Sequence, residues 1–215
     1  MKKKNTLLTA IFILTLFVLF TALLQIVDVR AIGPRNSVVG MATINRFVHN
    51  LTGVNLTLYN ITDWLGLVPL LFAVGFAFLG LVQLIKRRKL LKVDYSILIL
   101  GGFYIVTMLA YVFFEKVVIN YRPTLINGYL EVSYPSSTTL LVMCVMPTSI
   151  MQLKSRIKNK KFENLTTISI TIFIAFMVVA RLISGVHWLT DIIGGALLST
   201  GLVIMYYSIS NFKQK

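Results

Sequence analysis

The sequence has few charged residues, very few acidic ones, and a single cysteine. Charged residues make up 13% of the 215 residues, about half of the roughly 25% found in soluble domains. A disordered polycation is excluded, because such chains combine high charge with low hydrophobicity. A soluble nucleic-acid-binding protein is excluded as well, because its basic residues would have to coat a polar surface. Cys144 alone rules out an intrachain disulfide framework and a multi-cysteine metal site.

Apolar residues are abundant instead, at 57% of the chain, and they occur in long runs. A helix needs about 20 mostly apolar residues to cross a hydrocarbon core about 30 Å thick. Six stretches approach that length: 6–27, 65–85, 95–114, 138–153, 165–183 and 190–208. The sequence therefore predicts an all-α integral membrane protein, with six transmembrane helices in one bundle and a single membrane domain over residues 1–215. The segment 28–64 is expected to form short interfacial helices on the outer side.

Basic residues are distributed unevenly among the ends and connections of these stretches. The chain carries 21 Lys and Arg against 7 Asp and Glu, a net charge of +14. Most of the basic residues lie at the two ends of the chain and in the connections after the second and fourth stretches: Lys2, Lys3, Lys4, Lys86, Arg87, Arg88, Lys89, Lys92, Lys154, Arg156, Lys158, Lys160, Lys161, Lys213 and Lys215. An excess of Lys and Arg marks the cytoplasmic side of a membrane protein. Both termini are thus predicted to be cytoplasmic, in a multi-pass protein of the cytoplasmic membrane. Contact with anionic lipid explains the charge without a nucleic-acid partner.

Polar residues gather on the opposite, outer side. They follow the third stretch, precede the fourth, end the fifth and open the sixth: Arg122, Ser136, Ser137, Arg181, His187 and Asp191. Because the predicted topology places all these ends at one membrane surface, residues far apart in the sequence are expected to meet there.

The residue types suit an anion site with a nucleophile. Guanidinium groups match two phosphate oxygens, and a helix N-terminus attracts an anion. His187 and Asp191 are four residues apart and share one helix face, so the carboxylate can fix the imidazole tautomer and leave the other nitrogen free to attack phosphorus. Neither a metal nor a cofactor is predicted, because one His and scattered carboxylates form no recognisable ligand set.

Each residue alone has a plainer interpretation. Arg122 and Arg181 suit side chains that reach from helix ends to lipid headgroups, Ser136 suits a helix cap, and His187 suits an interfacial position. Asp191 favours a functional site, because a carboxylate at the start of an apolar span is costly unless it is paired.

Together these residues resemble the three motifs of the type 2 phosphatidic acid phosphatase family of membrane lipid phosphatases. The third motif is present as Ala180-Arg181, five residues, His187, three residues and Asp191. The second corresponds to Pro135-Ser136-Ser137-Thr138, and the first to Arg122-Pro123, with Glu115 at the family's lysine position and Lys116 one residue later.

The resemblance implies that His187 attacks the substrate phosphorus to form a phosphohistidine, oriented by Asp191. Arg122, Arg181 and the Ser136-Ser137 pair would hold the phosphoryl oxygens. Thr138 replaces the histidine that serves the family as general acid, a loss that typically costs about 100- to 10,000-fold in rate. Glu115 opposes binding of a dianionic phosphate, although its carboxylate is a candidate replacement proton donor. A diphosphate depends least on the missing acid, because its phosphate leaving group is already a weak base.

Two functions remain open from the sequence. The first is a lipid phosphatase acting at the outer face on a polyprenyl diphosphate or phosphatidic acid. The alternative is a catalytically impaired homologue that binds or moves phospholipid headgroups. Retention of both His187 and Asp191 favours the enzyme, because a headgroup-binding protein needs the arginines but no oriented nucleophile. The sequence does not predict an oligomeric state.

Overall fold

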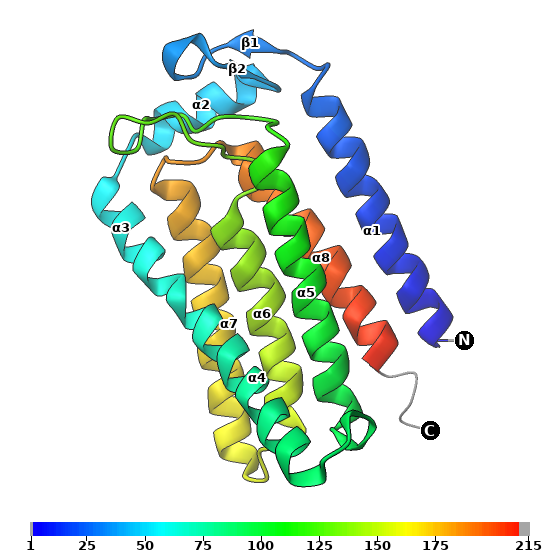
Figure 1. The fold of residues 1–215 in the computed structure, drawn as a ribbon. Helices are drawn as coiled ribbons and strands as arrows, with labels where there is room; N and C mark the ends of the chain where they lie inside the picture. Colours follow the sequence, from blue (N-terminus) through cyan, green and yellow to red (C-terminus); the bar gives the residue numbers. More distant parts are fainter. Residues whose placement is uncertain (1, 211–215) are drawn as a thin grey trace.

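The computed structural model describes residues 2–210, which form a long helical bundle with a small cap over one end (Figure 1). Lys213 and Lys215, counted above among the basic residues, lie outside the described residues. The elements in order are α1 (Lys2–Leu24), β1 (Arg30–Ala31), η1 (Pro34–Asn36), β2 (Val38–Val39), α2 (Ala42–Thr52), α3 (Leu56–Leu65), α4 (Leu67–Arg87), η2 (Leu90–Lys92), α5 (Tyr95–Lys116), α6 (Ser137–Lys154), α7 (Lys160–Ile183) and α8 (Leu189–Ser210).

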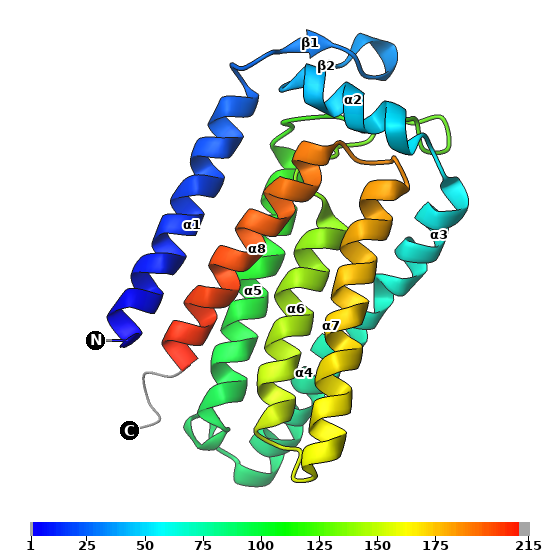
Figure 2. The same cartoon turned by 180° about the vertical axis from the view of Figure 1, so that it is seen from behind.

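Within residues 2–210, five helical segments are long and apolar enough to cross a membrane, namely Lys4–Leu24, Leu56–Arg87, Tyr95–Lys116, Lys160–Ile183 and Leu189–Ser210. Helix α6, which covers the fourth predicted stretch, is not among them. It packs against α4, α5, α7 and α8, and it stands inside the bundle in both views (Figures 1 and 2). A helix surrounded by other helices does not need a lipid-facing apolar surface, so polar residues such as Thr148, Ser149 and Gln152 are tolerated there.

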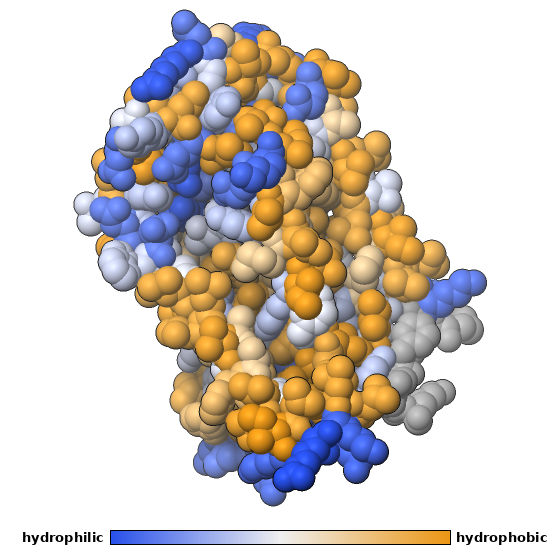
Figure 3. All heavy atoms as spheres, viewed as in Figure 1, coloured by the Kyte–Doolittle hydropathy of each residue, from blue (hydrophilic) through white to orange (hydrophobic). Residues whose placement is uncertain are grey.

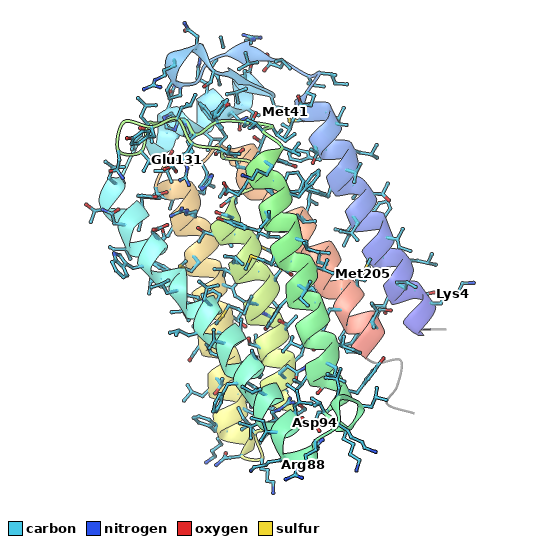
Figure 4. All side chains as sticks on the ribbon, viewed as in Figure 1. Lys4, Met41, Arg88, Asp94, Glu131 and Met205 are labelled. Carbon is cyan, nitrogen blue, oxygen red and sulfur yellow. The ribbon has the colours of Figure 1, made fainter. Side chains whose placement is uncertain are left out.

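The flank of the bundle is apolar and its two ends are polar (Figure 3). Helices α1, α4 and α5 expose large hydrophobic side chains on this flank, among them Phe12, Leu71, Phe78 and Ile105. Arg88 and Asp94 lie at the end away from the cap, whereas Glu131 lies at the capped end (Figure 4). This distribution is the one expected for a bundle that sits in hydrocarbon with its ends in water.

The segment between α1 and α4 forms the cap. It contains α2 and α3, as expected of short helices, and also an antiparallel pair of two-residue strands that the sequence did not predict. Strands of that length are too short to produce a recognisable alternation of apolar and polar residues. The buried amide of Asn45 fastens α2 to α8, because its Nδ2 donates to Thr190 Oγ1 and its Oδ1 accepts from Thr190 N. The cap is therefore fixed to the beginning of the helix that carries Asp191.

Tyr134 anchors the chain just before α6. Its ring contacts Phe17 of α1 and Phe114 of α5, and its hydroxyl is 2.7 Å from Thr21 Oγ1. Gly194 of α8 provides the space, since a Cβ at that position would lie 2.4 Å from the Tyr134 ring. Three helices thus hold the segment that leads into the N-terminus of α6.

Candidate active site

The predicted site residues come together at the capped end of the bundle. Four helix ends meet there: the C-termini of α5 and α7 and the N-termini of α6 and α8 (Figures 1 and 2). The loop 117–136 folds back on itself beside them, with Arg122 N donating to Glu131 O and Ser133 N donating to Asn120 O. Trp188 Nε1 donates to Tyr121 O at 2.8 Å and ties the loop to α8. Backbone pairing therefore positions the polar side chains of this loop.

His187, Ser133 and Asp191 form a buried chain of polar contacts. The Ser133 hydroxyl donates to Asp191 Oδ2 and lies 3.0 Å from His187 Nδ1. The direct separation between His187 Nδ1 and Asp191 Oδ2 is 3.7 Å. The sequence predicted that His187 and Asp191 share one helix face and that the carboxylate meets the imidazole directly. In the structure His187 lies in the turn before α8, which begins at Leu189, and the Ser133 hydroxyl bridges the ring and the carboxylate.

The donors around Asp191 compensate its burial, which is complete. Besides Ser133, Trp188 N donates to Oδ2 at 2.8 Å and Asn120 Nδ2 donates to Oδ1 at 3.2 Å. A buried carboxylate is tolerated only with such partners. Through them Asp191 links the loop 117–136 to the start of α8.

This arrangement defines the tautomer of His187. Because the Ser133 hydroxyl uses its one proton toward Asp191, its oxygen can only accept from the ring, which places a hydrogen on Nδ1. The lone pair of the neutral imidazole then lies on Nε2, a buried atom with no hydrogen-bond partner. Burial, and next the charges of Arg122 and Arg181, hold the pKa of His187 well below its usual 6.5. The ring is therefore neutral and nucleophilic at neutral pH.

Both predicted arginines are buried and held by the protein. Arg181 Nη1 donates to Thr62 Oγ1 at 3.1 Å, and its Nη2 lies 3.6 Å from Asp63 Oδ1. Arg122 Nε lies 3.1 Å from Glu131 Oε2. The Tyr59 ring lies near both guanidinium carbons, at 4.7 Å from that of Arg181 and 5.7 Å from that of Arg122. Side chains held in this way differ from arginines that reach freely toward headgroups.

Two adjoining hollows connect these groups. The larger has a volume of about 500 Å³ and is lined by Asp63, Tyr111, Glu115, Arg122, Glu131, Val132, Ser137 and Arg181. The smaller measures about 10 Å³ and contains His187 and Ser133 in its wall, which is room for about one water molecule. Tyr111, Glu115, Val132 and Ser137 line both. A phosphoryl group entering the larger hollow would therefore meet two guanidinium groups, and the adjoining hollow has the imidazole in its wall.

The two serines of the second motif differ in position. Ser136 is the N-cap of α6, and its Oγ accepts from Thr139 N at 3.4 Å and from Thr139 Oγ1 at 3.1 Å. Ser137, not Ser136, lines the two hollows, and so does Glu115. Thr138 and Lys116 line neither hollow.

Sequence reasoning missed the residues that hold the predicted ones in place: Asn120, Ser133, Tyr59, Thr62, Asp63 and Glu131. Asn120 lies within the first motif, between Glu115 and Arg122, and Ser133 lies just before the second; these locations were the one available signal for them. Tyr59, Thr62 and Asp63 belong to α3, whose approach to α7 no local pattern predicts. The described residues include no group of three or more His, Cys, Asp or Glu that could hold a metal ion.

Comparison with known proteins identifies a family and a similar fold. A model of the PAP2 superfamily matches residues 71–215, a range that contains all the motif residues. The structure is similar to the crystal structure of a transmembrane PAP2-type phosphatidylglycerolphosphate phosphatase from Bacillus subtilis, with a TM-score of 0.57 and 16% sequence identity over 93% of this chain and 94% of that one. At this identity the likeness shows the fold.

A search of curated proteins found no match. The long apolar helices and the fold of the solved membrane protein indicate a multi-pass membrane protein. With a family model covering more than half of its length, the chain belongs to the PAP2 superfamily.

Proposed function

We propose that the protein is a membrane lipid phosphatase that hydrolyses a lipid phosphate or diphosphate ester through a phosphohistidine on His187. One observation carries this proposal: the buried Nε2 of His187 has no hydrogen-bond partner, while Nδ1 is held by Ser133 and, through it, Asp191. A protein that only binds headgroups needs the two arginines but gains nothing from an imidazole oriented in this way.

The proposed reaction starts with attack of His187 Nε2 on the phosphorus. A bond forms between Nε2 and phosphorus while the bond from phosphorus to the leaving oxygen breaks. The imidazole becomes positively charged, and the Ser133–Asp191 pair stabilises it through Nδ1. Arg122 and Arg181 hold the phosphoryl oxygens as charge develops on them. Water then cleaves the phosphorus–nitrogen bond and releases inorganic phosphate.

The site favours a diphosphate ester over a monophosphate ester. Thr138 offers no group that titrates near neutral pH, so an alkoxide leaving group would lack a proton donor, whereas a phosphate leaving group needs none. Asp63, Glu115 and Glu131 also line the larger hollow beside the two arginines; they weaken the attraction for either anion, so the preference for a diphosphate rests on the leaving group. A polyprenyl diphosphate is therefore our first candidate substrate and phosphatidic acid our second.

The proposed membrane orientation places the site on the outer face. Arg88, at the end of α4, lies at the opposite end of the bundle from Glu131 of the candidate site (Figure 4), and lysine-rich connections face the cytoplasm. We accordingly propose that α6, the fourth stretch along the chain, crosses the membrane as well. It would bring the number of spans to six, with the other five facing lipid, and both termini would be cytoplasmic.

Phosphate release by purified protein tests the proposal. In detergent, with a polyprenyl diphosphate as substrate, the protein should release inorganic phosphate, and His187→Ala should abolish that release. The matched control is His49→Phe, which changes the other histidine of the chain and keeps a ring against Trp188. Unchanged release by His187→Ala would refute the enzyme. Tight lipid binding without any release by the unaltered protein would favour the headgroup-binding alternative.

A further inference from the structure

Glu115 lies where the two hollows of the candidate site adjoin. It lies in the last turn of α5 and is exposed. Among residues 2–210, it is the one charged side chain that lines both hollows, the larger with Arg122 and Arg181 and the smaller with His187. A group at the junction of the two hollows lies where a phosphoryl group bound by the arginines would meet the histidine.

The other carboxylates of the site already have partners. Glu131 pairs with Arg122 and Asp63 pairs with Arg181, while Asp191 accepts from Ser133, Trp188 and Asn120. The ion pairs of the described residues do not include Glu115. The side chain of Glu115 is hydrogen-bonded to that of Tyr111. Glu115 is thus the carboxylate of this site that is held neither by an arginine nor by the Ser133–Asp191 pair, and we assign the proton transfer to it.

We propose that Glu115 is the general base of the second half-reaction, in which water hydrolyses the phosphohistidine. This inference rests on the proposed function. It assigns to the end of α5 the proton-transfer work that Thr138, at the start of α6 and lining neither hollow, does not perform.

The half-reaction balances with groups of the site and one water molecule. The carboxylate of Glu115 takes a proton from water as the water oxygen forms a bond to phosphorus. The phosphorus–Nε2 bond breaks at the same time, and its electron pair returns to the imidazole, which regains its neutral form. Inorganic phosphate leaves through the larger hollow, and Glu115 releases its proton to solvent.

The direction of attack suits a base at this place. In-line displacement requires the water to approach from the side opposite Nε2, which is the side that the leaving group has vacated. In the proposed reaction the leaving group departs through the larger hollow, and Glu115 belongs to its wall as well as to that of the smaller one. A diphosphate requires no acid in the first half-reaction, so a single base completes the cycle.

The test is the level of phosphoenzyme during turnover. Glu115→Gln keeps the size of the side chain but removes the base, so steady-state turnover of a polyprenyl diphosphate should fall about 100- to 10,000-fold. Because dephosphorylation becomes limiting, the fraction of protein carrying phosphohistidine should rise in alkaline-quenched samples measured by intact mass. Lys116→Gln, at an exposed neighbour that lines neither hollow, should leave both quantities unchanged.

A second variant restores the histidine that the family has at position 138. Adding Thr138→His to Glu115→Gln should restore turnover and lower the phosphoenzyme level, because it returns a titratable group to α6. If Glu115→Gln fails to fold, Glu115→Asp should still show slowed dephosphorylation, because its shorter carboxylate stands farther from the water.

Two results would overturn the assignment while leaving the phosphatase in place. One is full turnover by Glu115→Gln. The other is reduced turnover with a lower phosphoenzyme level, which would place Glu115 in substrate binding or in the first half-reaction. Failure of the proposed function looks different: the unaltered protein would release no phosphate, or His187→Ala would release as much.

Discussion

At the scale of single residues, the serine between His187 and Asp191 determines what the imidazole can do. A hydroxyl that donates to the carboxylate must accept from Nδ1, so it transmits the tautomer preference across the 3.7 Å that separates the ring from the carboxylate. It contacts the ring at Nδ1, and the opposite nitrogen, Nε2, has no hydrogen-bond partner.

Replacing Ser133 therefore tests whether this link matters. Ser133→Ala leaves His187 Nδ1 without its partner, and turnover should fall about 10- to 100-fold, the usual effect of removing a group that orients a functional histidine. The KM should change little, because Ser133 does not line the larger hollow. Steady-state kinetics on a polyprenyl diphosphate measures both.

Ser133→Thr is the matched control, because it keeps the hydroxyl and should keep more activity than Ser133→Ala. Equal turnover in Ser133→Ala and the unaltered protein would show that the hydroxyl is not needed to orient the ring.

The protonation of His187 can be measured directly. The chain has 2 histidines, so His49→Phe, expressed with a histidine-free tag, leaves His187 as the sole imidazole for nuclear magnetic resonance. Burial and the two arginine charges lower the pKa of His187, so its ring signals should stay those of the neutral form as the pH falls through 6.5.

The same shift has a consequence for stability. Below pH 6.5 the unfolded chain binds a proton at residue 187 that the folded chain does not, so the free energy of unfolding should fall as the pH decreases. A ring that titrates at 6.5 or above would contradict both the burial and the influence of the arginines.

At the scale of elements, the short turn between α7 and α8 decides where His187 lies. Gly185 adopts a φ of +65°, and a Cβ there would lie 1.7 Å from Gly53 O at the end of α2. Asn55 N donates to Ser184 O at 2.9 Å. The turn that precedes His187 is therefore packed against the cap, and a side chain at position 185 is excluded on both steric and conformational grounds.

Gly185→Ala should consequently destabilise the fold and displace His187. We expect a loss of about 2 kcal/mol or more, because backbone strain and overpacking act together. The midpoint temperature of thermal unfolding, measured in detergent, and the turnover should both decrease. Gly75→Ala in α4 is the control, because nothing lies within 4 Å of the Cβ it would add. Unchanged stability and activity in Gly185→Ala would mean that the turn does not position the histidine.

The elements also show what a sequence can predict and what it cannot. Apolar runs predicted the helices, because the bilayer imposes a length on each of them. The third motif was readable because Arg181 at the end of α7, His187 in the short turn and Asp191 at the start of α8 are close together in the sequence. The roles of Ser133 and Asn120 could not be predicted, because the loop that carries them shows no regular alternation of apolar and polar residues. Its shape comes from backbone hydrogen bonds within the loop. Whether the sequence-predicted residues are catalytic stays a prediction.

At the scale of the whole molecule, charge and hydropathy divide the bundle into an apolar flank, a basic end and a capped end with the candidate site (Figures 3 and 4). The distribution predicts which end faces out. The native Cys144 is fully buried, so introduced cysteines can report the orientation without interference.

Tyr129→Cys, in the exposed loop beside the site, should react with a membrane-impermeant thiol reagent in intact cells. Lys158→Cys, between α6 and α7, should react only after the membrane is permeabilised. Labelling by mass shift or fluorescence gives the answer, and the reverse pattern would place the site in the cytoplasm.

The central claim is that His187 becomes covalently phosphorylated. The most direct measurement uses a polyprenyl diphosphate carrying ³²P in its terminal phosphate, mixed with purified protein and quenched in alkali within milliseconds to seconds. We predict label on the fragment that contains His187, stable to alkali, lost in acid, and absent from His187→Ala. Rapid phosphate release with no label on His187 at any time would contradict the account.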